Sequence, residues 1–300
     1  MSTEGGDRAP ARAAAVVVDY DAGDVLGACV RSLLDDGVRE VVVVENGEAS
    51  TACRVLEGLR VPLVVTGRNL GYGAGANRGL AASGGSEYVL VCNPDVRVHP
   101  GAVARLVTAL DTHPEWAIVG PRIVDPSGEE YPSVRRFPSM ADAAGHALFA
   151  LVRPENRFSR RYRDRVGDES RPVDWVSGAC FCARRAALEE LGGFDEAYFM
   201  FAEDIDLCWR AHRAGWGVGV EPHAEVTHVL GVSRRLHPYR MLVAHHRSAL
   251  RFEARRAEGV ERLALPAAAA VLGVRLAMAL AGEALRRGKH GDAVGPGGRG

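Results

Sequence analysis

The stretch Tyr88–Asp95, Tyr-Val-Leu-Val-Cys-Asn-Pro-Asp, constrains the fold of this chain more than any other. Its apolar start suits a strand that is buried on both faces, as in a parallel sheet. Pro94 has no N–H to donate, so the strand must end at Asn93. Ligands of open α/β sheets bind just beyond such strand ends, where a carboxylate such as Asp95 can share Mg²⁺ with phosphate oxygens. Asn-Pro and Asp are also common turn formers, and this stretch alone favours a plain turn.

Strands alternate with helices over the first 122 residues, which predicts βαβ units and an α/β fold with a mainly parallel sheet. The expected strands are Ala13–Val18, Val41–Val44, Val61–Val65, Tyr88–Cys92 and Trp116–Val119. The expected helices are Asp24–Leu34, Thr51–Leu59, one ending near Ser83, and Gly101–Asp111.

The alternation breaks after Pro121, and the second half is more irregular. We expect a turn at 125–128, a basic insert with a helix near Ala141–Leu151, strand-like composition over Val173–Cys182, helices Arg184–Leu191 and Glu203–Ala214, a strand Gly217–Val220, and helices Pro238–Arg256 and Leu263–Arg287. The chain then divides into a disordered arm (1–12), two halves of one α/β domain (13–122 and 123–235), C-terminal helices (236–287) and a disordered tail (288–300).

Charge and cysteine content limit the partners and the compartment. The net charge of −1 gives no global field that would recruit nucleic acid or membrane. Arginines nevertheless cluster at 135–171 and 234–262, which fits an anionic or membrane-bound partner. The six cysteines show no metal-binding spacing and are typical of core residues in a reducing compartment. The apolar run Ala13–Val18 is too short for a signal peptide, so we expect a cytosolic protein.

The last apolar stretch, Ala264–Leu285, is long enough to cross a bilayer, but it contains Arg275 and Glu283. A helix on the membrane surface, followed by Arg286, Arg287 and Lys289, is one interpretation. A plain core helix is an equal alternative.

Three further features are candidate sites. Gly71, Gly73 and Ala76 satisfy G-x-G-x-x-A, which keeps a nicotinamide-dependent oxidoreductase open. The same glycines could instead let the backbone approach a nucleotide sugar beside Asn69 and Asn77, or form a simple turn. The sequence Glu-Asp-Ile-Asp at 203–206 offers a general base, or only acids at a helix N-terminus. His228 by itself is more often a structural residue than a metal ligand.

Six segments, in this order and spacing, together resemble the inverting GT-A glycosyltransferases of family 2. They are Val16–Asp21, Glu45–Gly47, Asn69–Gly73, Asn93–Asp95, Gly192–Glu196 and Glu203–Asp204. More narrowly, Tyr131–Ser133, Arg135–Ser139, Trp175–Gly178 and Ala244–Ser248 are similar to actinobacterial rhamnosyltransferases that act on decaprenyl-diphosphate N-acetylglucosamine. The chain departs from the family pattern at Asn93, Asp21 and Glu45, where an acid, Asn and Asp are common.

The resemblance implies a role for each matching residue. Donor-binding residues would be Asp19, Tyr20, Asp21, Asn46, Asn69, Gly71, Asn77, Asn93 and Asp95. Asp95 and His228 would hold Mg²⁺ or Mn²⁺, and Asp204 would be the catalytic base with Glu203 as neighbour or substitute. Trp175, Gly178, Arg135 and Arg136 would bind the acceptor. Residues 13–122 would then hold the nucleotide sugar, and 123–235 the acceptor and the catalytic groups.

The implied reaction moves L-rhamnose from dTDP-L-rhamnose to a polyprenyl-diphosphate-linked N-acetylglucosamine, in synthesis of a cell-wall linker. The implied location is the cytoplasm, at the inner face of the plasma membrane, with a homo-oligomer possible. Transfer from another nucleotide sugar is the nearest alternative. A nucleotidyltransferase, a non-catalytic nucleotide-sugar binder and the oxidoreductase are the others. The glycosyl-transfer hypothesis requires Asp95 and Asp204 to converge on one pocket.

Overall fold

The computed structural model describes residues 9–48, 50–137, 164, 166–229 and 238–291. The helix expected near Ala141–Leu151 lies outside the described residues, as do most of the expected arm and tail. The segment Pro10–Arg12, which the sequence analysis assigns to the arm, forms a short 3₁₀ helix. Arg12 makes ion pairs of 2.7 Å with both Glu87 and Asp111, so these residues belong to the folded domain.

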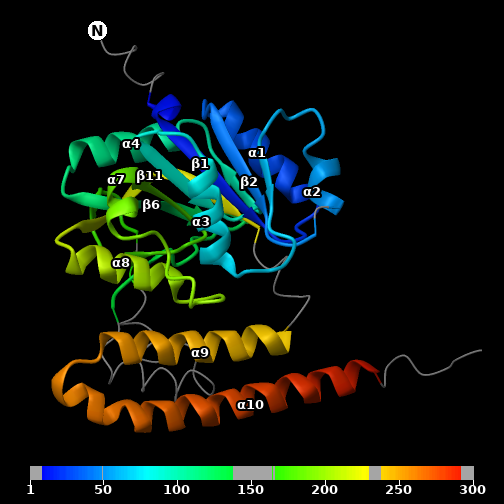
Figure 1. The fold of residues 1–300 in the computed structure, drawn as a ribbon, viewed down its shortest axis with the longest axis vertical. Helices are drawn as coiled ribbons and strands as arrows, with labels where there is room; N and C mark the ends of the chain where they lie inside the picture. The colour runs from blue at the N-terminus through cyan, green and yellow to red at the C-terminus, as the bar shows by residue number, and fades with distance from the viewer. Residues whose placement is uncertain (1–8, 49, 138–163, 165, 230–237, 292–300) are drawn as a thin grey trace, which may run out of the picture.

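A nine-stranded sheet forms the centre of the molecule, with strand order β3-β2-β1-β4-β10-β6-β11-β5 and β8 paired with β11 (Figure 1). Its strands are β1 (Ala13–Asp19), β2 (Glu40–Glu45), β3 (Leu63–Val65), β4 (Tyr88–Cys92), β5 (Val96–Val98), β6 (Trp116–Val124), β8 (Arg171–Pro172), β10 (Cys180–Arg184) and β11 (Gly217–His228). A two-stranded ribbon pairs β7 (Val134–Arg135) with β9 (Trp175–Val176).

The helices follow the predicted order closely, with ends shifted by a few residues. They are α1 (Asp24–Asp35), α2 (Ser50–Val55), α3 (Tyr72–Ala82), α4 (Ala102–Thr112), α7 (Arg185–Glu190), α8 (Glu203–Arg213), α9 (Pro238–Arg256) and α10 (Leu265–Gly291). A 3₁₀ helix, Gly259–Ala264, joins α9 to α10.

The expected α/β architecture is confirmed, although the sheet is mixed. The first half is parallel, since β1 pairs with β2 and β4, and β2 with β3. Strand β10 enters antiparallel between β4 and β6, and β11 runs antiparallel to β5 and β8. Strand β11 is also much longer than the predicted Gly217–Val220, because its second part pairs with both β6 and β5. This extension carries His228 to the same region as β4.

Alternating residues of the buried strands pack in two hydrophobic cores, one on each face of the sheet. Ala15 and Val17 of β1 join the core that contains Leu26 of α1 and Leu106 of α4. Val16 and Val18 of the same strand join the core with Ala76 of α3 and Ile205 of α8. The alternation follows from the two-residue period of a strand, which sends successive side chains to opposite faces.

The glycine-rich segment forms helix α3, and its glycines allow close packing. A Cβ on Gly79 would lie 2.2 Å from Cγ1 of Val16, so α3 approaches β1 more closely than a side chain would permit. Gly71 precedes the helix with φ of +96°, and a Cβ there would meet the Phe199 carbonyl oxygen at 2.2 Å. These glycines therefore serve helix–sheet packing and a tight approach of two chain segments.

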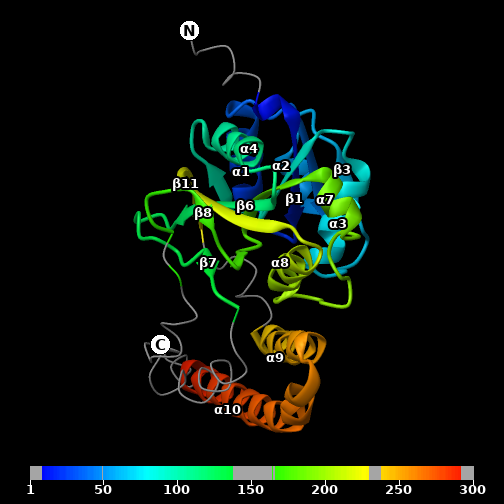
Figure 2. The ribbon, with the colours of Figure 1, turned by 90° about the vertical axis from the view of Figure 1, so that its left-hand side faces the viewer.

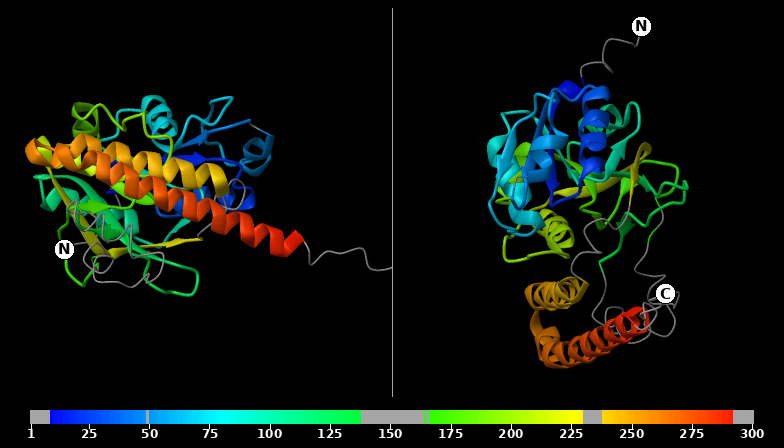
Figure 3. Two further views of the ribbon diagram at one scale, coloured as in Figure 1. Left: turned by 90° about the horizontal axis from the view of Figure 1, so that it is seen from below. Right: turned by 90° about the vertical axis from the view of Figure 1, so that its right-hand side faces the viewer.

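Helices α9 and α10 form a separate layer beside the α/β domain (Figure 2). They pack side by side along much of their length (Figure 3), and α9 lies between α10 and the domain. Contacts of α9 with the domain include a 2.9 Å hydrogen bond from Ser248 Oγ to the Met200 carbonyl and an edge-on contact between Trp209 and Phe252.

Candidate active site

Three strands of the parallel half end in polar residues at one edge of the sheet. Because β1, β2 and β4 are parallel neighbours, Asp19, the Glu45–Asn46 pair and the Asn93–Asp95 turn meet at this edge. All but Asn93 of the side chains named here are buried. The sequence analysis predicted polar groups at these strand ends, and the topology brings them together.

Asp19 and Glu45 form a buried carboxyl pair. They face each other across β1 and β2 and are 1% and 2% exposed. Burial and the adjacent Asp19 raise the pKa of Glu45 to about 8. Burial also raises the pKa of Asp19, but hydrogen bonds from Glu45 and from Ala22 N–H oppose the shift. We therefore place one shared proton on Glu45 at neutral pH, with Asp19 ionised.

The residues next to this pair differ in exposure and strain. Tyr20 is half-buried and lies beside Gly47. Asp21 is exposed and has a φ of +50°, which is uncommon for a residue other than glycine. Such conformations concentrate at binding sites, where surrounding structure holds them.

Asn46 and Asn77 have side chains that fasten loops. Asn46 Nδ2 donates to the Gly71 carbonyl at 2.9 Å, and its Oδ1 accepts from Leu70 N–H at 3.0 Å. Asn69 Oδ1 accepts from Gly71 N–H at 2.9 Å. Asn77 brackets Phe194, accepting from its N–H and donating to its carbonyl, both at 2.9 Å. In this structure the amides order the walls of the site, and their direct contact with a donor stays a prediction.

Asp95 and His228 lie side by side, as a shared metal site requires. Asp95 Oδ1 is 3.1 Å from His228 Nε2, and both side chains are 9% exposed. Asn93 Nδ2 is 3.3 Å from the same ring nitrogen. His228 Nδ1 is buried and lacks a hydrogen-bond partner within the part of the chain that the structure describes.

These two side chains fit part of a divalent metal site. No cluster of three or more His, Cys, Asp or Glu that could hold a metal occurs among the described residues. One carboxylate and one imidazole leave most positions of a Mg²⁺ or Mn²⁺ ion open for phosphate oxygens and water, which is how Mg²⁺ is commonly bound. A metal here would therefore depend on the substrate diphosphate for much of its coordination.

Helix α8 begins with the second carboxyl pair, Glu203 and Asp204. The two residues before it, Phe201 and Ala202, have φ of +67° and +63°. Asp204 Oδ2 accepts from Gly178 N–H at 2.9 Å, and Oδ1 accepts from Ile205 N–H at 2.9 Å. Glu203 is 7% exposed, and its Oε2 has no hydrogen-bond partner among the described residues.

The surroundings raise the pKa values of both carboxyl groups, but they stabilise the charged form of Asp204 more than that of Glu203. Burial and the Asp204 charge raise the pKa of Glu203 to about 8. Burial raises the pKa of Asp204 too, but two backbone N–H groups and the Arg135 charge oppose that shift. Glu203 therefore keeps a proton at neutral pH, and the two backbone N–H groups make Asp204 the better placed of the two to carry the charge. A pair of carboxyl groups separated in this way assigns the base to the ionised one.

Two of the acceptor residues expected from the sequence, Gly178 and Arg135, lie near Asp204. Gly178 donates to it directly, as described above. Arg135 stacks over the Trp175 ring with its guanidinium carbon 5.1 Å from the ring centre, and Trp175 is 4% exposed beneath it. Arg136 is exposed, with its Nε 4.0 Å from Asp164 Oδ2. Arg135 thus lies near Asp204, while Arg136 lies at the surface.

A short chain of contacts joins Asp204 to Asp95. Gly178 binds Asp204, and the next residue, Ala179, accepts a 2.9 Å hydrogen bond from Asn93 N–H. Asn93 in turn approaches His228, the neighbour of Asp95. The two carboxylates therefore lie on either side of one continuous cluster.

Two residues of the site were missed by sequence reasoning or given another role. Tyr72 donates from its hydroxyl to the Gly178 carbonyl at 2.6 Å, which links α3 to the acceptor side. Its place inside the Gly-Tyr-Gly motif was the available signal. Asp206, the third acid of the 203–206 cluster, is fully buried and bound by Arg210 at 2.8 Å and by the Tyr198 hydroxyl at 3.2 Å, so it is structural.

Sequence comparison decides the family. A model described as "Glycosyltransferase like family 2" matches residues 10–250. The chain belongs to glycosyltransferase family 2. The chain is 38% identical over 259 residues to the N-acetylglucosaminyl-diphospho-decaprenol L-rhamnosyltransferase of Mycobacterium tuberculosis, covering 81% of this chain and 84% of that protein. It is 26% identical over 195 residues to the rhamnosyltransferase WbbL of Escherichia coli K12, covering 62% and 71%.

Solved structures agree on the fold of this family 2 enzyme. Residues 1–349 of TarS from S. aureus match with a TM-score of 0.52 and 15% identity, over 88% of this chain and 71% of that one. GalNAc-T7, solved with UDP, GalNAc and Mn²⁺, matches with a TM-score of 0.54 and 15% identity, over 72% of this chain and 43% of that one. The GT-A fold predicted from the sequence is thus confirmed, and family membership sets aside the oxidoreductase alternative.

Proposed function

We propose that this glycosyltransferase moves L-rhamnose from dTDP-L-rhamnose to N-acetylglucosamine carried on a polyprenyl diphosphate, with inversion at the anomeric carbon. The observation that carries the proposal is the 38% identity, over most of both chains, to a mycobacterial enzyme with that acceptor and sugar in its name. The carboxyl pair at the start of α8, which separates a neutral acid from an ionised base, supports an inverting displacement.

Asp204 is the proposed general base. The acceptor hydroxyl transfers its proton to an Asp204 carboxylate oxygen while the hydroxyl oxygen attacks the anomeric carbon. The bond from that carbon to the donor diphosphate breaks, and the electron pair leaves with the nucleoside diphosphate. Gly178 N–H and Ile205 N–H hold the carboxylate during the attack. A base in position supplies about 10²–10⁴-fold in rate.

The donor half supplies binding and orientation. Asp19 and Glu45, at adjacent strand ends, are proposed to face the nucleoside, and Asp95 with His228 to face the diphosphate. Mg²⁺ or Mn²⁺ held by Asp95 and His228 would stabilise the charge that develops on the leaving diphosphate. The 3.1 Å contact between these two side chains supports this assignment.

Helix α10 is proposed to lie on the cytoplasmic face of the membrane. The segment Gly259–Ala284 has the length and hydropathy of a membrane span, with a mean hydropathy of 2.0, and none of its 18-residue window is buried. The charged residues within it after the 3₁₀ turn, Arg275 and Glu283, are half-buried. Between Leu265 and Ala284 the exposed residues are all apolar: Pro266, Ala267, Ala270, Gly273, Val274, Ala277, Met278, Ala281 and Ala284. A helix with such a stripe suits the interface better than a crossing.

A substrate panel tests the proposed function. The purified full-length chain is offered dTDP-L-rhamnose, UDP-sugars and GDP-sugars in turn, together with a polyprenyl-diphosphate N-acetylglucosamine acceptor, with and without a chelator. We expect product from dTDP-L-rhamnose that is lost with chelator and restored by Mg²⁺ or Mn²⁺. Product from a different nucleotide sugar alone would assign another donor to the same fold.

A further inference from the structure

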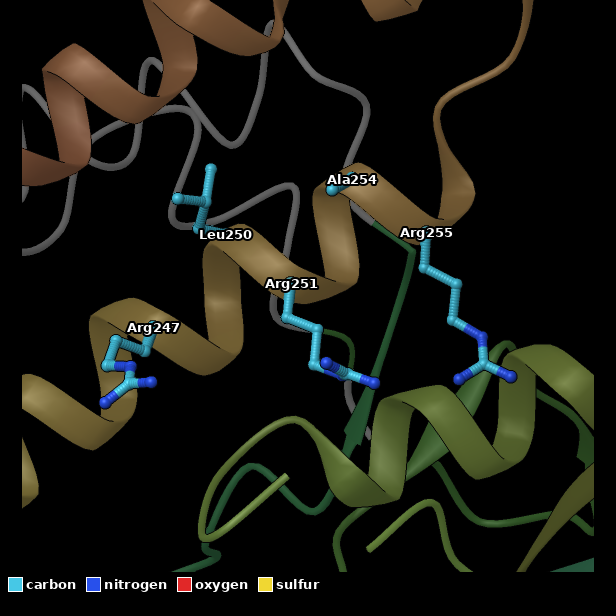
Figure 4. Close-up of a pocket in the computed structure, with 5 residues that line it drawn as sticks. All are labelled: Arg247, Leu250, Arg251, Ala254 and Arg255. Atoms are coloured by element: carbon cyan, nitrogen blue, oxygen red, sulfur yellow. The ribbon is translucent and has the colours of Figure 1, made fainter. Parts of the chain in front are cut away.

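Helix α9 presents a basic face beside the segment that precedes α8. Arg247, Leu250, Arg251, Ala254 and Arg255 line an open pocket along α9 (Figure 4). The three arginines are spaced by four residues, so they follow one another along the helix. Figure 4 shows Arg251 and Arg255 reaching from α9 toward the catalytic domain, with Leu250 on the other side of the helix. We call these five residues the α9 groove.

The positive charge of the α9 groove is only partly neutralised. Arg251 and Arg255 share the carboxylate of Asp195, with Arg251 Nη2 at 3.4 Å from it, and Arg255 Nε also lies 3.3 Å from Asp206. Asp206 is in addition bound by Arg210. Arg247 is exposed and has no ion-pair or hydrogen-bond partner among the described residues. The groove therefore carries an uncompensated guanidinium next to two that are partly available.

The α9 groove adjoins the segment that leads into the catalytic carboxyl pair. Ser248, the residue after Arg247, donates to the Met200 carbonyl at 2.9 Å. The Phe201 ring meets His245 edge-on with 5.2 Å between ring centres. Met200 and Phe201 lie within four residues of Asp204 in the chain. The arginines thus lie on the side of the active site from which α9 approaches, and α10 packs along that helix.

We propose that the α9 groove binds the diphosphate of a lipid-linked acceptor, with Arg247 and Arg251 as its main contacts. This subsite rests on the proposed function, because it assumes an acceptor that joins a sugar to a lipid through a diphosphate. The guanidinium fork pairs with two phosphate oxygens at once, which suits a diphosphate. Leu250 and Ala254 offer apolar surface for the first carbons of the lipid, and the apolar stripe of α10 would meet the rest. The sugar end then lies toward Asp204.

Arg247→Gln is the sharpest test, because this side chain is exposed and unpaired within the described structure, and the variant should fold. Activity is measured in detergent without phospholipid, on a short prenyl-diphosphate N-acetylglucosamine and on an uncharged alkyl N-acetylglucosaminide. We expect the ratio of kcat/KM on the diphosphate acceptor to kcat/KM on the uncharged acceptor to fall about tenfold or more, mostly through KM. Arg247→Lys keeps the positive charge but loses the two-pronged guanidinium group. Its kcat/KM ratio should lie between those of the unmodified enzyme and Arg247→Gln.

Two control variants fix the interpretation. Arg31→Gln, at an exposed position on α1 in the donor half, should leave the ratio and the melting temperature unchanged. Arg136→Gln tests the rival basic position near Trp175. An unchanged ratio in Arg247→Gln, or a loss confined to Arg136→Gln, would overturn the proposal.

Phospholipid headgroups share the chemistry of the acceptor diphosphate, so a vesicle arm separates the two sources. If Arg247→Gln lowers sedimentation with anionic vesicles but leaves the detergent ratio unchanged, the groove binds headgroups and the acceptor proposal is wrong. Failure of the proposed function would appear differently, as absence of transfer by the unmodified enzyme to either acceptor.

Discussion

The chemical role of each side chain in this site depends on its hydrogen-bond partners. Glu203 and Asp204 are neighbours in sequence and both are acids. Glu203 Oε2 nevertheless has no hydrogen-bond partner within the described structure, whereas Asp204 accepts from two backbone N–H groups. The sequence predicted that Asp204 is the base only through family resemblance. Which acid keeps the proton depends on Gly178, 26 residues away, and no local pattern reports that contact. Asn46 and Asn77 were predicted to contact the donor, but in the structure their side chains hydrogen-bond neighbouring loops. The sequence gives no sign of these hydrogen bonds.

The buried Glu203 should make stability depend on pH. Its pKa is raised to about 8 in the folded protein, whereas an unfolded glutamate titrates near about 4.3. Between these values the folded state holds a proton that the unfolded chain releases, so the free energy of unfolding falls as pH rises. The slope for one proton is at most about 1.4 kcal/mol per pH unit.

Glu203→Gln removes this titration. We expect the variant to gain stability relative to the unmodified chain as pH rises from 5 to 8, with little difference at pH 4. Urea unfolding at four pH values measures this gap. A gap that stays constant across the range would mean that Glu203 is ionised in the folded state.

The positions of helices and strands were predicted better than the pairing between strands. Helix α9 begins and ends at the predicted residues, and most strands are found within two or three residues of their expected positions. Periodicity and turn residues carry that information locally. The antiparallel entry of β10 and the long second part of β11 depend on pairing between distant segments, which has no local signature. The sequence left the glycine-rich segment open between a ligand-binding loop and a simple turn, because a sequence cannot show what a glycine packs against.

Helix α3 gives a direct test of glycine as a packing device. Gly79→Ala would place a methyl group against Val16 at the centre of the sheet, and overpacking of this kind costs about 1–3 kcal/mol. Gly85→Ala is the matched control, since a Cβ there meets nothing within 4 Å. We expect chemical denaturation to show a clear loss for the first variant and little change for the second. Equal stability of the two would show that α3 can move away from β1 without loss.

At the scale of the whole molecule, the catalytic domain and the C-terminal helices contribute different surfaces. The domain brings the proposed donor and acceptor groups to one edge of the sheet, and α9 and α10 add a layer with a basic face and an apolar face. Both faces were visible in the sequence as an arginine cluster and an apolar run. Their order in space, with the basic helix α9 between the apolar helix α10 and the α/β domain, required the structure.

The apolar stripe of α10 predicts membrane binding that depends on two exposed side chains. Val274 and Met278 are 60% and 55% exposed and lie one turn apart. Replacing both with Asp should greatly reduce sedimentation with vesicles, while activity on a short soluble acceptor stays within about twofold. Arg78→Gln, on α3 of the donor half, serves as the control for a general change in surface charge. Unchanged sedimentation of the double variant would remove α10 from the membrane contact.

The most direct test of the central claim is the turnover of Asp204→Asn, measured beside its binding of donor nucleotide. If Asp204 is the base of an inverting transfer, the variant should fold, bind the donor as tightly as the unmodified enzyme, and lose about 10²–10⁴-fold in kcat. The unmodified enzyme should give a product whose anomeric configuration is inverted relative to the donor. Near-normal kcat in Asp204→Asn, or a product with retained configuration, would contradict the account.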